Sequence, residues 1–125
     1  MKDDELVQIT NKLLSFNRAL LQKFKETKES GVEGDFYQEI KPFSDQLNET
    51  LKIWGERAKQ WIRNGQPKNL HVKQIESVME QFEMISVQAF FSQTSRTHFL
   101  NTVHSVEYVL KSLLSEIERE YIDNE

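Results

Sequence analysis

Residues 99–117 read FLNTVHSVEYVLKSLLSEI, and large apolar side chains recur in this stretch at alternating gaps of four and three. They are Phe99, Val103, Val106, Leu110, Leu113 and Ile117. This spacing places all of these side chains on one face of an α-helix, because the helix completes a turn every 3.6 residues or so, about 100° per residue. The stretch therefore predicts an amphipathic helix whose apolar face packs against other elements.

Three earlier stretches carry apolar stripes with similar spacing. The first consists of Leu6, Ile9, Leu13, Phe16, Leu20 and Phe24. The second consists of Phe36, Ile40, Phe43, Leu47, Leu51, Trp54, Ala58 and Trp61, and the third of Ile75, Val78, Phe82, Ile85 and Ala89. Four stripes joined by short breaks predict an all-α fold in one domain over residues 1–125, built as an antiparallel four-helix bundle in up-down-up-down order.

Glycine and proline mark the first two breaks in this pattern. We predict a first helix from about residue 3 to residue 29, ended by residues 30–34, which contain two glycines. The second helix is predicted to end within residues 64–69. There Gly65 suits the left-handed residue that terminates many helices, and Pro67 prevents easy continuation.

The start of the second helix carries a capping signal and a proline. Asp35, followed three residues later by Gln38, resembles a capping box, in which side chains satisfy free backbone N–H groups of the first turn. Pro42 lies inside the second stripe, although proline lacks an N–H and clashes with the carbonyl four residues earlier. We therefore predict that the second helix is kinked near Pro42, or that a one-turn helix is joined to a longer one beginning there.

The boundary between the third and fourth helices contains neither glycine nor proline. We expect the third helix to run from residues 69–71 to residues 92–94. Thr94 or Ser95 is expected to cap the fourth helix, which continues to about Tyr121. Alternatively, the two segments form one bent helix. In the four-helix interpretation each helix has roughly 24–30 residues and is about 36–45 Å long.

Composition and charge argue against several classes of protein. Hydrophobic residues make up 38% and charged residues 29% of the 125 residues, which is typical of a helix-rich globular protein. The net charge is −4, whereas most nucleic-acid binders carry a basic excess. No apolar run is long enough to span a bilayer, and the acidic residues 3–5 are unlike a secretory signal. We expect a cytoplasmic protein with no nucleic-acid or membrane partner.

The sequence predicts no catalytic residues, no metal site and no cofactor. Cysteine is absent, and no nucleophile elbow, glycine-rich phosphate loop or Glu-x-x-His metal motif is present. His98 and His104 lie about 240° apart around one helix and His71 lies on another, so the three are poorly placed to share a metal. A row of acids beside the third stripe is typical of a solvated face: Glu76, Glu80 and Glu83. We therefore expect that the protein is not an enzyme.

Two groups of side chains are candidate binding sites, although the default role of aromatic residues on these stripes is core packing. Trp61, near the end of the second helix, lies beside Arg57 and Arg63, and its indole N–H needs a partner if it is buried. His71 is expected nearby, across the following turn. The second candidate is an aromatic pair just before the predicted kink, Phe36 and Tyr37.

The predicted topology gathers four helix termini at one end of the bundle. The first and fourth helices bring acids to this end: Asp3, Asp4, Glu5, Glu116, Glu118, Glu120, Asp123 and Glu125. The second and third bring bases: Arg57, Lys59, Arg63, Lys68 and Lys73. The acids at the end of the fourth helix oppose its dipole. Two interpretations remain open: they pair with nearby bases or stay solvated, or they recognise a basic partner.

Two stretches are similar to a known family: Asp35-Phe36-Tyr37-Gln38-Glu39-Ile40-Lys41-Pro42 and Pro67-Lys68-Asn69-Leu70-His71-Val72-Lys73-Gln74-Ile75-Glu76. With Trp54 between them, the chain resembles the YppE-like family of Gram-positive bacterial proteins. The resemblance covers most of the chain and implies a compact helical domain of unknown function. It carries over no active-site or ligand residues.

Two functional hypotheses follow from these sequence features. The first is a non-enzymatic cytoplasmic module that binds an unknown protein partner, because a well-specified bundle here displays a dense surface of mixed charge. The alternative is a bundle that binds a small ligand or a metal, which the three histidines, the carboxylate row and the aromatic content motivate. The sequence does not predict the oligomeric state.

Overall fold

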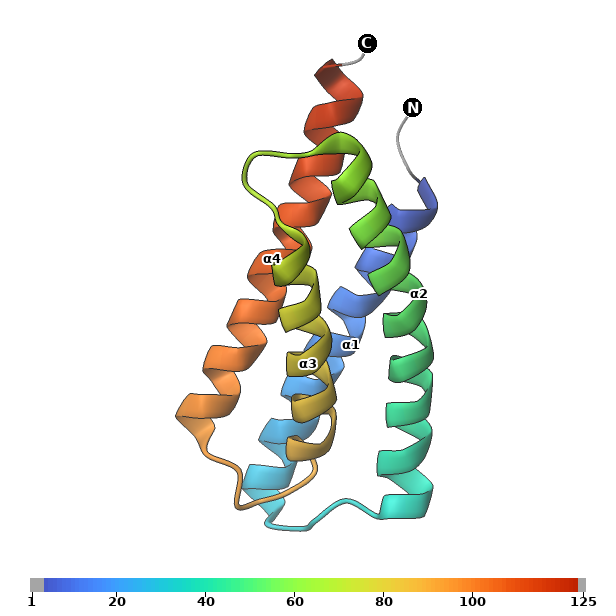
Figure 1. The fold of residues 1–125 in the computed structure, drawn as a ribbon. Helices are drawn as coiled ribbons and strands as arrows, with labels where there is room; N and C mark the ends of the chain where they lie inside the picture. The colour runs from blue at the N-terminus through green and yellow to red at the C-terminus, as the bar shows by residue number, and fades with distance from the viewer. Residues whose placement is uncertain (1–3, 124–125) are drawn as a thin grey trace.

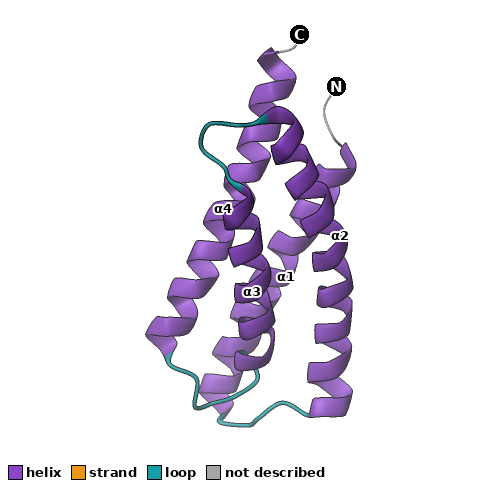
Figure 2. Cartoon of the chain, viewed as in Figure 1, coloured by secondary structure: helices purple, strands orange, loops and turns teal. Residues whose placement is uncertain are grey.

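The chain folds into a four-helix bundle. The computed structural model describes residues 4–123, which form four long α-helices and one short π-helical turn, with no strand in that range (Figures 1 and 2). The helices are α1 (Asp4–Ser30), α2 (Lys41–Gly65), α3 (Val72–Gln88) and α4 (Arg96–Asp123), and the turn is η1 (Phe36–Ile40). Both α1 and α3 pack against α2 and α4. This arrangement confirms the predicted up-down-up-down order.

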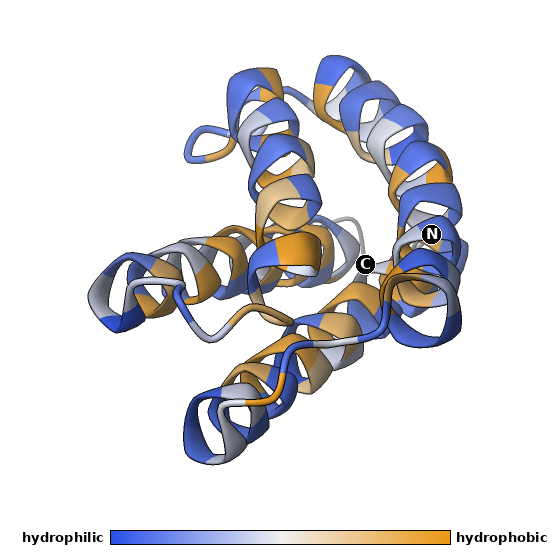
Figure 3. Ribbon diagram, turned by 90° about the horizontal axis from the view of Figure 1, so that it is seen from below, coloured by the Kyte–Doolittle hydropathy of each residue, from blue (hydrophilic) through white to orange (hydrophobic). Residues whose placement is uncertain are grey.

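The apolar stripes of the four helices meet in one interior. Seen along the bundle, the hydrophobic residues lie mainly on the inner sides of the helices (Figure 3). Leu47, Phe82 and Leu110 have no exposed surface, and the ring of Phe24 stacks on that of Phe99 with centroids 4.1 Å apart. Sequence reasoning also placed Phe36 on the second stripe, which is wrong. Its side chain is 54% exposed, because it belongs to η1 and precedes the regular part of the second helix.

A one-turn π-helix, η1, continues directly into α2 just before Pro42, in agreement with the predicted one-turn helix joined to a longer one. The N–H groups of Ile40 and Lys41 donate to the carbonyls of Asp35 and Phe36, five residues back in each case. Pro42 then occupies the first turn of α2, where a missing N–H removes no intrahelical bond. The π-helical turn therefore places Pro42 at the start of α2, where proline fits the helix geometry.

The capping interactions around η1 differ from those predicted. Asp35 Oδ1 accepts a hydrogen bond from the Gln38 N–H at 2.8 Å, as a cap should. The reciprocal acceptor for the Asp35 N–H is Glu39 Oε2 at 3.0 Å, not the Gln38 side chain. The wider π-helical turn explains this shift, because it brings a side chain one residue further along back over the start of the turn.

Glu39 makes the stability of this turn depend on pH. The hydrogen bond from the Asp35 backbone N–H and then that from Lys23 Nζ, at 3.1 Å, lower the pKa of Glu39 from its ordinary value of 4.5. The folded state thus favours the carboxylate, so its stabilising effect is present above pH 4.5 and is lost as the pH falls through the lower folded-state pKa.

We predict that Glu39→Gln lowers the melting temperature at neutral pH and that the difference from wild type shrinks as the pH falls below 4.5. Thermal unfolding followed by circular dichroism across this range measures both effects. Glu83 is an exposed acid on α3. Glu83→Gln serves as the control, because it changes the net charge by the same amount. A Glu39→Gln deficit that stays constant with pH would contradict the prediction.

Two details of the helix ends differ from the prediction, although α2 ends at Gly65, within the predicted range 64–69. The left-handed residue after α2 is Gln66, with φ of 45°, whereas Gly65 is the last residue of the helix. The third helix is also shorter than predicted, with 17 residues, and residues 89–95 separate it from α4. The alternative of one bent helix is therefore wrong. Ser95 caps α4, since its Oγ accepts a hydrogen bond from the His98 N–H at 3.3 Å.

Donors from residues 27–34, distant in sequence, bind the segment that follows α3. Thr27 Oγ1 donates to the Ala89 carbonyl at 3.0 Å, and Lys28 Nζ donates to the Ser92 carbonyl at 2.8 Å. The Gly34 N–H donates to the Phe90 carbonyl at 2.9 Å. These donors satisfy carbonyl groups that a longer helix would have paired internally.

Candidate functional site at Trp61

The ends of α2 and α4 project beyond the start of α1. Arg57 forms an ion pair with Glu5 at 2.9 Å, so the first turn of α1 lies level with Arg57, and Trp61 follows one turn later on α2. The last turns of α4 likewise extend past the beginning of α1 (Figure 1). The α2–α3 loop, residues 66–71, occupies the same end of the bundle. Trp61 therefore lies where the bundle has fewer than four helices around its axis.

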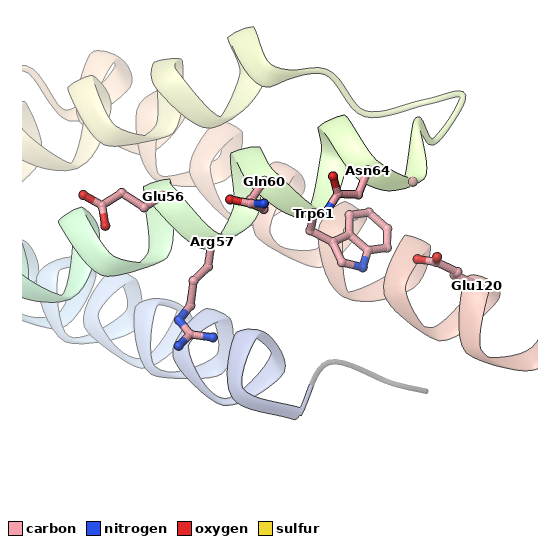
Figure 4. Close-up of a pocket in the computed structure, with 7 residues that line it drawn as sticks. Glu56, Arg57, Gln60, Trp61, Asn64 and Glu120 are labelled. Atoms are coloured by element: carbon pink, nitrogen blue, oxygen red, sulfur yellow. The ribbon is translucent and has the colours of Figure 1, made fainter.

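A surface hollow surrounds Trp61 on α2, next to the end of α4. Its volume is about 540 Å³, and we call it the Trp61 hollow. It is lined by Gly65 and by six side chains drawn in Figure 4: Glu56, Arg57, Gln60, Trp61, Asn64 and Glu120. A second hollow, of about 440 Å³, shares Trp61, Gly65 and Glu120 and continues over residues 66–68. Trp61 thus borders two adjoining depressions.

The two tryptophans of the chain have different environments. Trp54 is fully buried, and its indole N–H donates to Thr10 Oγ1 at 3.0 Å. Trp61 is half-buried, packing against the edge of the core while the rest of its indole is accessible from the hollow. Figure 4 shows this ring extending from α2 towards the segment of α4 that carries Glu120.

Charge in the Trp61 hollow is mostly negative once ion pairs are considered. The guanidinium of Arg57 is directed towards α1, where it pairs with Glu5 (Figure 4). Within residues 4–123, by contrast, neither Glu56 nor Glu120 forms an ion pair. Gln60 and Asn64 add amide groups that both donate and accept hydrogen bonds. An aromatic surface, free carboxylates and amides together suit binding of a polar, positively charged group.

The structure brings together only part of the predicted Trp61 cluster. Arg57 and Trp61 both line the hollow. Arg63 is exposed and lies outside both hollows, because two residues correspond to about 200° around a helix. His71 is also exposed and outside them: it precedes α3, where its N–H donates to Gln74 Oε1 at 2.8 Å.

Sequence reasoning missed three lining residues on α2, although a signal for them exists. Glu56, Gln60 and Asn64 recur at intervals of four and so follow one side of the helix beside Arg57 and Trp61. Glu120 was expected at this end of the bundle among the acids of α4, and the structure places it there. Asp3 and Glu125, also assigned to this end, lie outside the described residues.

The second predicted site lies at the opposite end of α2. Phe36 is 54% and Tyr37 78% exposed, and their rings meet edge to face with centroids 5.1 Å apart. The three histidines are all exposed: His71, His98 and His104. Within residues 4–123, no group of three or more potential ligands is placed to hold a metal ion.

Comparison with known proteins defines the family. Residues 10–117 match the family described as a bacterial domain of unknown function, DUF1798. The chain belongs to the DUF1798 family. It is 28% identical over 120 residues to the uncharacterized protein YppE of Bacillus subtilis, covering 96% of this chain and 98% of that protein. The resemblance expected from the sequence motifs is thereby confirmed.

Solved structures of DUF1798 relatives share the fold. The crystal structure of YppE from Bacillus subtilis superimposes with a TM-score of 0.89 at 28% identity, covering 96% of this chain and 98% of that one. A Listeria innocua protein of unknown function gives a TM-score of 0.88 at 26% identity, with 94% of each chain covered. A DUF1798 domain from Staphylococcus aureus, 23% identical, gives 0.84 over 91% of this chain and 96% of that one. Among residues 4–123, no helix has the length and hydrophobicity needed to cross a membrane.

Proposed function

We propose that this DUF1798 protein is a non-enzymatic cytoplasmic module that binds a partner protein through Phe36 and Tyr37. The observation that supports this function is the exposed edge-to-face pair formed by the two rings on η1. Single exposed apolar residues are common on protein surfaces, whereas adjacent exposed aromatic rings resemble the aromatic residues enriched at protein interfaces. The two rings are the side chains most suited to enter a partner's apolar pocket.

The turn that carries the two rings is held in place by its own polar groups. Asp35 accepts from the Gln38 N–H, and Glu39 binds both the Asp35 N–H and Lys23 of α1. These bonds fix η1 against the end of α1, so little conformational entropy would be lost when a partner binds the rings. π-helical turns of this kind also occur frequently at functional sites. A binding role explains why such a turn displays aromatic side chains.

The chemistry around Trp61 supports binding rather than catalysis. The side chains that line the Trp61 hollow offer carboxylates, amides and a guanidinium, but neither a hydroxyl nor a thiol nor an imidazole. Covalent catalysis by a hydroxyl, thiol or imidazole group therefore has no nucleophile among these lining residues. The lining residues are therefore better suited to recognition of a partner group.

A photo-crosslinking experiment in a bacterial host tests the proposed function. A photoreactive amino acid at position 37 is expected to capture a specific protein, and the same residue placed at position 108 serves as the control. Tyr108 is also strongly exposed, at 70%, but lies on α4 away from η1. Co-purification of the captured protein is expected to fall at least about ten-fold in the variant Phe36→Ala/Tyr37→Ala, as for loss of an interface hot spot.

Two results would contradict the proposal. One is a double variant that retains every specific partner of the wild-type protein at wild-type level. The other is capture of the same proteins from positions 37 and 108, which would indicate non-specific contact. The melting temperature of the double variant should stay close to that of wild type, because both side chains are exposed.

A further inference from the structure

We infer that the Trp61 hollow is a binding site for an arginine side chain presented by a partner protein. The hollow lies at the other end of α2 from Phe36 and Tyr37 and therefore constitutes a second site. The inference goes beyond the proposed function, because it specifies the chemistry of the bound group and does not depend on the aromatic pair. It rests on three properties of the hollow: its aromatic wall, its free carboxylates and its amides.

The aromatic wall is supplied by Trp61. Tryptophan is the side chain that binds cations best through its ring face, and a flat guanidinium also stacks on it. Half-burial of Trp61 against the core holds the ring in place while leaving part of it accessible from the hollow. The same wall would offer an anionic group no favourable contact with the negative face of its π-system.

The carboxylates give the hollow the charge that a cation requires. Glu120 of α4 lies beside Trp61, whereas Glu56 lies further along α2 at the other end of the hollow, and neither forms an ion pair within the described range (Figure 4). Among the described residues that line the hollow, the one cation is Arg57, and it already forms an ion pair with Glu5. A guanidinium stacked on Trp61 would therefore meet the uncompensated carboxylate of Glu120, and Glu56 adds negative charge further along the hollow.

The amides favour arginine over lysine as the occupant. A guanidinium presents five N–H donors in one plane, whereas an ammonium presents a compact point charge. The side-chain carbonyls of Gln60 and Asn64 follow Glu56 along the same side of α2 and can accept the donors that the carboxylates leave unpaired. Stacking on Trp61 and in-plane hydrogen bonding can thus occur together.

The experiment uses the purified chain and a defined probe. The indole N–H signals of ¹⁵N-labelled protein are followed by NMR while the peptide acetyl-Ala-Arg-Ala-amide is added. Trp61 reports on the hollow, whereas Trp54 is fully buried and hydrogen-bonded to Thr10 and serves as an internal control. We expect the Trp61 signal to move with a dissociation constant on the order of 1 mM, as for one weakly held side chain, and the Trp54 signal to stay in place.

Two matched peptides test whether the charge of the guanidinium matters. Citrulline has the same shape as arginine but is neutral, so its peptide is expected to bind at least about ten-fold more weakly. The corresponding glutamate peptide is expected to leave the Trp61 signal unchanged. Equal shifts with the arginine and citrulline peptides, or no shift with the arginine peptide, would overturn the inference.

Variants of the carboxylates locate the site. Glu56→Gln and Glu120→Gln are each expected to raise the dissociation constant about two- to five-fold, the range for exposed charge pairs. Glu83→Gln on α3 changes the net charge equally but lies outside both hollows, so it should leave the constant unchanged. An equal effect of all three variants would show attraction to the overall charge and would contradict a site at Trp61.

The outcome separates this inference from the proposed function. Phe36→Ala/Tyr37→Ala should bind the arginine peptide as wild type does, because both rings lie at the far end of α2. If this double variant binds the arginine peptide normally and also retains its partner protein, only the role of the aromatic pair is contradicted. If the wild-type protein does not bind the arginine peptide while the double variant loses its partner protein, only the arginine site is contradicted.

Discussion

Replacing Trp54 with alanine is expected to lower the free energy of unfolding by about 3–5 kcal/mol, the largest effect of any single change considered for this chain. Trp54 has no exposed surface and is the largest fully buried side chain, so its removal leaves a cavity in the centre of the bundle. The change also removes the hydrogen bond from the indole N–H to Thr10 Oγ1. Thr10 keeps its own bond to the Leu6 carbonyl at 2.7 Å.

Urea denaturation followed by far-ultraviolet circular dichroism measures this effect without depending on tryptophan fluorescence. Trp61→Ala is the matched control: the same atoms are removed from a half-buried position, and we expect a loss of less than about 2 kcal/mol. Equal losses for the two tryptophans would contradict the burial seen in the structure.

The hydrogen bond and the cavity of Trp54 can be separated. Thr10→Val keeps the shape of the side chain but leaves the indole N–H buried without its acceptor, at an expected cost of about 1–3 kcal/mol. In a double-mutant cycle with Trp54→Phe, this cost should largely disappear, because phenylalanine has no N–H to satisfy. Additive losses would show that the bond contributes little.

Gly34→Ala is expected to lower the free energy of unfolding by about 1–3 kcal/mol, although it adds a single methyl group. A Cβ atom at this position would lie 2.6 Å from Cδ1 and 2.9 Å from Cβ of Phe90. The Phe90 side chain is only 4% exposed and cannot move away freely, and its carbonyl accepts the Gly34 N–H. The added methyl must therefore push apart the two loops that this hydrogen bond joins.

Gly65→Ala, by contrast, is expected to raise the free energy of unfolding measured by urea denaturation. A Cβ there would meet only Glu120 carboxylate oxygens at 3.6 and 3.7 Å, which is ordinary contact, and Gly65 is the last residue of α2. Alanine is the better helix former, so we expect a gain of up to about 1 kcal/mol. A Gly34→Ala variant with the same free energy of unfolding as wild type would show that the contact with Phe90 relaxes easily.

Helical periodicity was sufficient to predict the fold because burial repeats with the helix. Each stripe places its residues on one side of a helix, and four such sides close a single core with little choice of topology. A change in the helix near Pro42 was predictable for a similar reason, since proline is disfavoured in the interior of a regular helix. Phe36 shows the limit: it continues the stripe in sequence, but the π-helical turn rotates it out of register with α2.

Features that depend on partners distant in sequence were not predictable. The segment after α3 is bound by Thr27, Lys28 and Gly34, whose donors meet the carbonyls of residues 89, 92 and 90 only in the folded chain. At the candidate site, Trp61 and Arg57 could be identified because they are neighbours on one helix. Their association with Glu120 depends on how far α2 and α4 extend past α1, and apolar spacing does not encode that length.

The interior of the bundle is complete before α4 ends. Ile117 is the last buried side chain of that helix, and Glu120 comes one turn later on a segment that is exposed throughout. Substitutions in this final turn can therefore change the lining of the Trp61 hollow without altering the core of the bundle. In the proposed arginine site, the residues that contribute to specificity and those that stabilise the core thus lie in separate portions of a single helix.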